Sequence, residues 1–368
     1  MHPTALDRER LKQALALASS SFGLTEPNPR VGCVLGHADG RVLGQGATQA
    51  AGAAHAEVMA LRDAQAAGLH THGSTAWVTL EPCAHFGRTP PCCDALIAAG
   101  VARCVVAIGD PHPLVSGHGL ARMRAAGVEV VVLDADDTLS REAYEINIGF
   151  FSRLQRGRPW LRAKVAVSAD GRVALLDGQS KWITGEQARA DGHRWRLRAS
   201  AVMTGIGTVL ADNPRLDVRA VPAPAQPLRV VLDRQLRLPP DAAVLRPPGQ
   251  VLVVATRGNA PAAARLRAAG AEVWDEDSVG LPELLQRLAS RGINEVHLEA
   301  GPKLTGAFAE AGLVDEWLIY VAPLLLGPGL PMAALSKLDE LKTAMRYRWY
   351  EAASLGDDLR LRLRRRDV

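Results

Sequence analysis

Strand-like apolar runs alternate with helix-like runs along the first 150 residues of the chain. This alternation predicts an α/β layer arrangement, because helices and a sheet can then bury their apolar faces against one another. Helical spacing occurs in the segments 6–18, 55–68 and 93–101. The strand candidates are 31–37, 41–48, 75–80, 104–110 and 128–133.

A second alternating series begins after the charged segment 154–160, which contains Gly and Pro and follows a helix-like stretch at 141–154. Its helical stretches include 261–270 and 303–312, and its strand candidates are 160–168, 228–233, 250–256, 295–300 and 316–326. The chain has 368 residues, which exceeds the size that one hydrophobic core usually serves. We therefore expect two α/β domains, 1–150 and 158–368.

Composition and charge exclude several classes of protein. No window reaches the roughly 18 uninterrupted apolar residues of a membrane helix, and Asp7 and Glu9 stand where a signal peptide has a basic start. A net charge of +4 is too small to indicate a nucleic-acid partner. The basic stretch 359–366 alternates leucine with arginine, which predicts a half-buried strand with its arginines in water. We expect a soluble, cytoplasmic protein.

The strongest chemical signal is a group of cysteines that follows a His-Ala-Glu run. Segment 81–93 holds three of the five cysteines, and His55 opens a predicted helix earlier in the chain. A catalytic zinc ion takes three nitrogen or sulfur ligands and keeps a fourth position for water. His55, Cys83 and Cys92 meet this requirement, and Glu57 can point into the same site and carry protons. This is the ligand layout of zinc deaminases.

Alternatives to a catalytic zinc site stay open. Eight residues separate Cys83 from Cys92, whereas nucleobase deaminases have two, so a longer loop must intervene. His85 could serve as a fourth ligand and close the site. A structural zinc site and a metal-free thiol cluster are further interpretations. Cys93 points about 100° away from Cys92 around the predicted helix and is expected to pack, and Cys33 and Cys104 lie in apolar runs as core residues.

Several segments together carry a family resemblance. PNPRVG at 27–32, VTLEPC at 78–83 and GRTPPCCDALIAAGVAR at 87–103 precede KVAVSADGR at 164–172 and LEAGPKLTGAFAEAGLVDEW at 298–317. This pattern resembles the bifunctional deaminase/reductase family of riboflavin biosynthesis over nearly the whole chain. The resemblance implies an N-terminal cytidine-deaminase-like, three-layer α/β/α domain and a C-terminal dihydrofolate-reductase-like α/β domain.

The resemblance also implies the chemistry. Zinc-dependent hydrolysis would remove an amine from a phosphoribosylated diaminopyrimidinone, with Glu57 as the acid/base. NADPH would then reduce the ribosyl chain to a ribityl chain. We expect a zinc hydrolase joined to an NADPH-dependent oxidoreductase, acting on a small molecule as a homo-oligomer, with no nucleic-acid or membrane partner.

Matching motif by motif, the resemblance implies two further sets of site residues. Those near the substrates would be Asn28, His85 and Arg88 in the first half and Ser180, Arg196, Leu216, Arg219 and Glu299 in the second, with Arg196 or Arg219 balancing the phosphate. Those near NADPH would be Ala166, Trp182, Thr208, Asp212, Gly301, Pro302, Lys303, Leu304, Thr305, Gly306 and Ala307. Without the family resemblance, the glycines of 301–307 would indicate a tight structural turn.

Five positions depart from the family's usual residues, namely Ala84, Phe86, His112, His118 and Ala169. None of them is a proposed zinc ligand or the acid/base, so they bear on substrate affinity. Two other functions are alternatives to this one. A tRNA or nucleobase deaminase with an accessory domain should carry a basic, aromatic surface, and the chain has only 4% aromatic residues. A zinc-stabilised binding module is the alternative outside enzymes.

Overall fold

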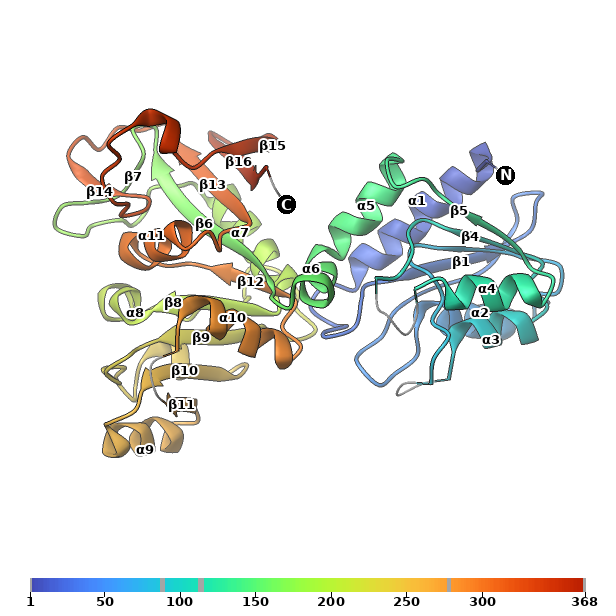
Figure 1. The fold of residues 1–368 in the computed structure, drawn as a ribbon, viewed down its shortest axis with the longest axis horizontal. Coiled ribbons are helices and arrows are strands. Elements are labelled where there is room, and N and C mark those ends of the chain that lie inside the picture. Colours follow the sequence, from blue (N-terminus) through green and yellow to red (C-terminus); the bar gives the residue numbers. More distant parts are fainter. Residues whose placement is uncertain (1, 87–89, 112–115, 277–278, 367–368) are drawn as a thin grey trace. The chain divides into compact units, whose positions relative to one another are not determined.

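The computed structural model describes residues 2–86, 90–111, 116–276 and 279–366. The chain divides into two compact units, 1–157 and 158–368, each built around its own sheet (Figure 1). Among the described residues, no helix is long and apolar enough to cross a membrane.

The first unit contains a five-stranded sheet in the order β2-β1-β3-β4-β5. Its strands are β1 (Gly32–Gly36), β2 (Val42–Ala47), β3 (Thr75–Val78), β4 (Arg103–Val106) and β5 (Glu129–Val132). Its helices are α1 (Ala5–Ser20), α2 (Ala56–Ala66), α3 (Cys92–Ala98), α4 (His118–Ala125), α5 (Thr138–Ile146) and α6 (Ile148–Arg156).

Helices cover both faces of this sheet, which confirms the three-layer prediction. In Figure 1, α1 and α5 lie above the strands, and α2, α3 and α4 lie below them. Leu11 and Leu15 of α1 pack on one face with Trp77. Ala60 of α2 and Leu96 of α3 pack on the other. Each helix therefore buries one apolar stripe against the sheet.

At one end of the strands of the first sheet, the segment that precedes β1 lies beside the segments that follow β2 and β3. Strand β1 runs antiparallel to β2 and β3, with Gly32 opposite Ala47 and Cys33 opposite Val78. The ends of β2 and β3 therefore lie beside the start of β1. A Cβ atom on Gly46 would stand 2.7 Å from the carbonyl oxygen of Ala56, so this glycine lets α2 begin close to the sheet.

The second unit contains a nine-stranded sheet in the order β11-β10-β9-β8-β12-β6-β13-β16-β15 and a small sheet of β14 and β7. Its strands are β6 (Trp160–Ser168), β7 (Arg172–Leu175), β8 (Ala201–Gly205), β9 (Leu228–Leu232), β10 (Val251–Thr256), β11 (Glu272–Glu276), β12 (Glu295–Leu298), β13 (Glu316–Ala322), β14 (Gly329–Pro331), β15 (Tyr347–Leu355) and β16 (Asp358–Arg365). Its helices are α7 (Glu186–Arg198), α8 (Ile206–Asp212), α9 (Ala260–Ala268), α10 (Leu281–Ser290) and α11 (Pro302–Glu310), with the 3-10 turns η1 (Ala243–Leu245) and η2 (Leu341–Thr343).

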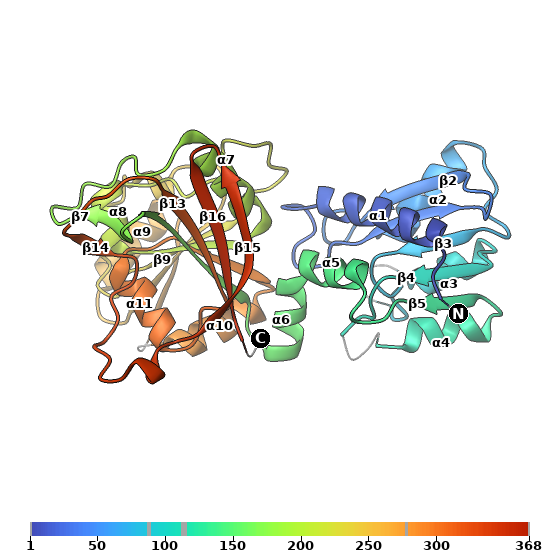
Figure 2. The same ribbon diagram turned by 90° about the horizontal axis from the view of Figure 1, so that it is seen from above.

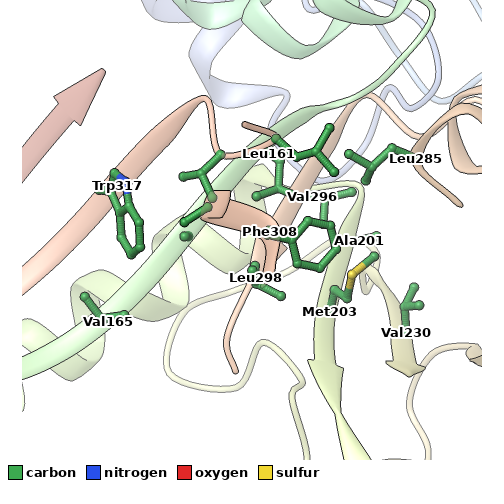
Figure 3. Close-up of a cluster of buried hydrophobic side chains, with 14 of the residues drawn as sticks. Leu161, Val165, Ala201, Met203, Val230, Leu285, Val296, Leu298, Phe308 and Trp317 are labelled. Atoms are coloured by element: carbon green, nitrogen blue, oxygen red, sulfur yellow. The ribbon is translucent and has the colours of Figure 1, made fainter. Parts of the chain in front are cut away.

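The two faces of this large sheet differ in chemistry. Helices α10 and α11 cover an apolar face, where Phe308 lies among Val296, Leu298 and Met203 (Figure 3). Helix α7 lies on the opposite side of the strands (Figure 2). The face beneath α7 carries buried charged groups, among them Arg162. The buried charged groups near α7 therefore lie on the side of the sheet away from α10 and α11.

The prediction that the arginines of the last strand lie in water is wrong. Arg362 and Arg364 of β16 are 6% and 5% exposed, and both pair with Glu316 of β13. Arg162 of β6 also reaches Glu316, at 3.4 Å. The alternation correctly predicts a strand, but the charged side faces inward because a buried carboxylate neutralises it.

Removing the shared carboxylate should destabilise the second unit strongly. Burial alone would raise the pKa of Glu316, but the three arginines outweigh it and hold that pKa far below its ordinary value of 4.5. The contribution of Glu316 to the stability of the folded state is therefore fully present above pH 4.5 and is lost as the pH falls further. We expect Glu316→Ala to lower the free energy of unfolding by about 3–5 kcal/mol, measured by urea denaturation at pH 7.

The matched control is Glu276→Ala, because Glu276 forms an exposed pair with Arg287. This variant should change the unfolding free energy by less than about 1 kcal/mol. Equal effects of the two substitutions would show that the buried pairs contribute nothing special.

The sequence misplaced or missed several elements. The helix-like stretch 141–154 is two helices, because Asn147 ends α5 and begins α6. Its side chain bonds to the backbone N–H and carbonyl of Arg30, which holds the break. Helices α4, α7, α8 and α10 and strands β7, β8, β11, β14 and β15 were not among the predicted elements. The proline-rich segment 220–227 is a loop.

Candidate active sites

His55, Cys83 and Cys92 come together although they stand far apart in the sequence. Nδ1 of His55 lies 3.3 Å from Sγ of Cys92 and 3.7 Å from Sγ of Cys83. Zinc bonds of about 2.0–2.1 Å to nitrogen and 2.3 Å to sulfur in a tetrahedron separate such atoms by about 3.6 Å. The three residues therefore fit a zinc ion. Among the described residues, this is the only group that could hold a metal, and it does not include His85.

Secondary structure fixes each of the three side chains. His55 is the N-cap of α2, Cys92 is the first residue of α3, and Cys83 follows β3. The backbone N–H of Cys92 donates to Sγ of Cys83 over 3.3 Å. A hydrogen bond from the Cys92 thiol lowers the pKa of Cys83 to about 4, which favours the thiolate that a metal requires.

Glu57 lies in the first turn of α2, beside the three residues. It is 4% exposed, and burial raises the pKa of its carboxyl group to about 7. Its carboxyl group also lies within hydrogen-bonding reach of the Cys92 sulfur. The carboxylate therefore points toward the ligands and away from bulk solvent.

The remaining thiols are packed. Cys33, Cys93 and Cys104 are fully buried in the core of the first unit, as predicted. All five cysteines are free.

Glu81 is a residue that the sequence reasoning missed. It is 4% exposed and stands two positions before Cys83. Its carboxylate accepts hydrogen bonds from the N–H groups of Gly117, at 3.0 Å, and Gly119, at 3.1 Å. Glu81 therefore ties the start of α4 to the segment that carries Cys83. Its position in the motif VTLEPC is the only sequence feature that could have indicated this role.

The predicted substrate contacts of the first unit have different settings. Asn28 is half-buried in the loop before β1, at the sheet edge where β3 ends. His85 is half-buried and Phe86 is 77% exposed, both after Cys83. Arg88 and His112 lie outside the described residues.

In the second unit, Arg196 and Glu299 form a close pair on the α7 side of the sheet. Nη2 of Arg196 donates to Oε2 of Glu299 over 2.8 Å, and a second bond joins Nε to Oε1. Burial opposes the charge of Glu299, yet Arg196, His297 and Lys164 together hold its pKa well below the ordinary value. Lys164 was not predicted as a site residue. The sequence feature that could have indicated it is a charged residue, like Arg162, within the otherwise apolar strand β6.

A second group of charges adjoins this pair. Nη1 of Arg196 donates to the backbone carbonyl of Asp217, whose carboxylate pairs with Arg219 at 2.7 Å. The Arg219 side chain is 51% exposed. Leu216 is 2% exposed and has a φ of 56°, a left-handed conformation that costs energy in a bulky residue. Such strain is frequent at ligand sites.

Two predicted NADPH contacts meet at the carboxyl ends of parallel strands. β8 and β12 are neighbours, and α8 and α11 begin just after them. The N–H of Gly301, the N-cap of α11, donates to Oγ1 of Thr208 over 3.1 Å. Helix starts at this place in a sheet offer N–H groups to phosphate, so these residues fit a dinucleotide.

The other residues predicted to contact NADPH lie in several different parts of the second unit. Lys181 pairs with Asp212 at 3.6 Å. The neighbouring Trp182 is 69% exposed, and the guanidinium of Arg189 in α7 lies 4.7 Å from the centre of its ring. Ala166 packs beneath α7, and Ser180 is half-buried. Pro302, Lys303, Leu304, Thr305 and Ala307 form the first turns of α11.

Gly306 has a structural reason to be glycine. A Cβ atom there would stand 2.0 Å from the carbonyl oxygen of Ala334. The close approach of residues 302–310 to that backbone therefore requires a glycine whether or not a cofactor binds.

Family models match both units. Residues 5–108 match the cytidine and deoxycytidylate deaminase zinc-binding region, and residues 159–359 match the RibD C-terminal domain. Together the two models span most of the chain.

Relatives match the chain over nearly its full length. The riboflavin biosynthesis protein RibD of Escherichia coli is 40% identical over 97% of this chain and 99% of its own, and that of Aquifex aeolicus is 39% identical over 96% and 97%.

Solved structures agree with these relatives. Acinetobacter baumannii RibD superposes with a TM-score of 0.88 at 41% identity, covering 98% of each chain. The Thermotoga maritima diaminohydroxyphosphoribosylaminopyrimidine deaminase/5-amino-6-(5-phosphoribosylamino)uracil reductase gives 0.87 at 30% identity, over 98% of this chain and 99% of its own. The zinc-fitting residues thus belong to a deaminase domain, and the charged face beneath α7 belongs to a reductase domain. The chain is a member of the RibD family, the bifunctional deaminase/reductases of riboflavin biosynthesis that use Zn²⁺ and NADPH.

Proposed function

We propose that the first unit deaminates a diaminohydroxyphosphoribosylaminopyrimidine and that the second reduces the resulting 5-amino-6-(5-phosphoribosylamino)uracil. The observation that carries this proposal is the group of one imidazole and two thiols, half-buried at His55 and Cys83 and buried at Cys92, with the buried Glu57 beside it. Three ligands leave a fourth position for water, as hydrolysis requires and a structural site does not.

In the deamination step, His55, Cys83 and Cys92 would hold the zinc ion, which would supply a nucleophilic water near neutral pH. A carboxylate oxygen of Glu57 would take up a proton as the substrate is attacked and deliver it to the departing amine. Burial of Glu57 keeps bulk water from competing for this proton. Asn28 and His85 bind the substrate at the same edge of the sheet, and Arg88 binds its phosphate.

In the reduction step, NADPH supplies the hydride. Thr208 and the N–H groups at the start of α11 bind its phosphates, and Ala166, Trp182 and Asp212 line its path. Ser180, Leu216 and Glu299 hold the sugar of the substrate. These roles are supported by the carboxyl-edge setting of α8 and α11 and by the charged face beneath α7.

Of the two arginines considered for the phosphate, Arg219 suits the role better. Arg196 already donates to both oxygens of Glu299 and to the backbone of Asp217. Arg219 is half exposed and shares Asp217 with Arg215, so its guanidinium can turn to an incoming phosphate. Arg196 instead orients Glu299.

The decisive experiment follows the two steps separately. The purified chain is given the phosphoribosylated diaminopyrimidine without NADPH, and ammonia is measured. NADPH is then added, and its oxidation is followed by the loss of its absorbance. Ammonia release followed by NADPH oxidation supports both activities. NADPH oxidation without prior ammonia release would contradict the order of the steps.

We also propose that the chain works in the cytoplasm as a homo-oligomer. Five free cysteines, two of them zinc ligands, suit a reducing compartment. Strand β15 lies at the end of the nine-stranded sheet and exposes Trp349, at 70%, and part of Tyr350. A sheet edge of this kind favours pairing with another strand, and a second copy of the chain is the partner proposed.

Replacing Trp349 by lysine should therefore weaken self-association. A charged edge residue opposes strand pairing and removes apolar contact area. We expect the apparent mass in analytical ultracentrifugation to fall toward that of one chain, 39.2 kDa, at concentrations where the wild type is larger. Leu341→Lys is the control, since Leu341 is 84% exposed but lies outside the strand. An unchanged mass for Trp349→Lys would contradict the proposed interface.

A further inference from the structure

His297 is a fully buried side chain whose ring nitrogens are unsatisfied. It lies in β12, at the centre of the nine-stranded sheet, between Arg162 of β6 and Val202 of β8. Its exposure is 0%, and neither Nδ1 nor Nε2 has a hydrogen bond of good geometry within the described residues. Buried polar atoms nearly always have partners, so this ring needs an explanation.

The nearest acceptor is a reductase-site carboxylate. Nε2 of His297 lies 3.4 Å from Oε1 of Glu299. The two residues stand two positions apart at the end of one strand, so their side chains leave the same face of the sheet. The apolar residue between them, Leu298, packs on the opposite face with α11. The ring therefore approaches Glu299 from within the sheet, whereas Arg196 approaches it from α7.

Charges around the ring favour its neutral form. Burial lowers the pKa of His297, and Arg162 and Arg196 lower it further, although Glu299 opposes them. A neutral imidazole carries one N–H and one acceptor nitrogen. With the proton on Nε2, the ring can donate to Glu299 without adding a charge to the site.

We propose that His297 is a positioning residue of the reductase, which donates from Nε2 to Oε1 of Glu299 and fixes that carboxylate for the substrate. Arg196 holds both oxygens of Glu299 but is carried by a long, flexible side chain. A ring enclosed in a central strand adds a rigid contact and limits rotation of the carboxylate. The inference rests on the proposed function, because Glu299 binds substrate only if the second unit is the reductase.

Three substitutions separate this role from a packing role. In His297→Gln, the amide nitrogen reaches about as far as Nε2, whereas in His297→Asn it reaches only about as far as Nδ1. His297→Leu keeps the bulk and removes every donor. We expect His297→Gln to keep kcat within about 3-fold of the wild type. We expect His297→Asn and His297→Leu to lower kcat by about 10-fold or more, with an unchanged KM for NADPH.

The same samples contain their own controls. Ammonia release by the first unit measures active protein, and it should be equal in all four chains. NADPH binding, followed by fluorescence, shows that the second unit is folded. Equal kcat values for the Gln and Asn variants, or a wild-type kcat for the Leu variant, would overturn the positioning role. A wild-type chain that never oxidises NADPH would instead refute the proposed function, so the two failures are distinguishable.

Discussion

Replacing Glu57 by glutamine is expected to slow ammonia release by about 10²–10⁴-fold, the usual contribution of a general acid/base. Glutamine has nearly the same shape but cannot take up a proton from water. Glu57 lies beside the ligands rather than among them, so zinc should remain bound at the wild-type stoichiometry. The measurements are ammonia release under saturating substrate and zinc content by atomic absorption.

The second unit provides the control for this variant. Reduction of supplied 5-amino-6-(5-phosphoribosylamino)uracil should proceed at the wild-type rate, because no residue of that unit is altered. If the variant releases ammonia at the wild-type rate, Glu57 is not the proton carrier. If it loses zinc, Glu57 has a role in holding the ion and the assignment of ligands is wrong.

Replacing Cys92 by serine should remove both zinc and deamination. A hydroxyl is a far weaker zinc ligand than a thiolate, and two remaining ligands do not hold the ion against dilution. We expect zinc content to fall from about one ion per chain to near zero, with loss of ammonia release. Dialysis of the wild type against a chelator should produce the same loss, and added zinc should restore activity only in the wild type.

The adjacent cysteine supplies the matched comparison. Cys93 is as buried as Cys92, but its sulfur lies 3.7 Å from Asp94 and outside the group of ligand atoms. Cys93→Ala should therefore keep zinc and deamination and show only the modest loss of stability of a small cavity. Zinc loss from Cys93→Ala together with retention by Cys92→Ser would reverse the ligand assignment.

Much of the fold could be predicted because apolar runs bounded by turns identify buried strands. The five strands of the first unit all lie within the predicted segments or within one residue of them. Strand β15 escaped because most of its residues are exposed and it lacks an apolar run. Helix α4 escaped because it is short and carries two arginines in its last turn. Local patterns are weak where tertiary contacts decide the structure.

The two candidate sites also differ in how far the sequence alone predicts them. The residue types of His55, Cys83 and Cys92 follow from the ligands that zinc prefers, so the sequence alone indicates them. The reductase cluster is not, because Arg196 and Glu299 stand on elements that only the sheet order brings together. The inward-facing arginines of β16 show the same limit. A period of two tells which side chains share a face, but it does not tell which face is covered.

The position of β16 in the sheet also sets an order of events during synthesis. This strand, residues 358–365, is inserted between β13 and β15, and its arginines complete the ion pairs of Glu316. The helices and strands of the first unit are all complete by Arg156. On the ribosome, the deaminase half can therefore acquire its native structure early. The reductase half must wait until residues 358–365 have been translated, because β16 completes its sheet.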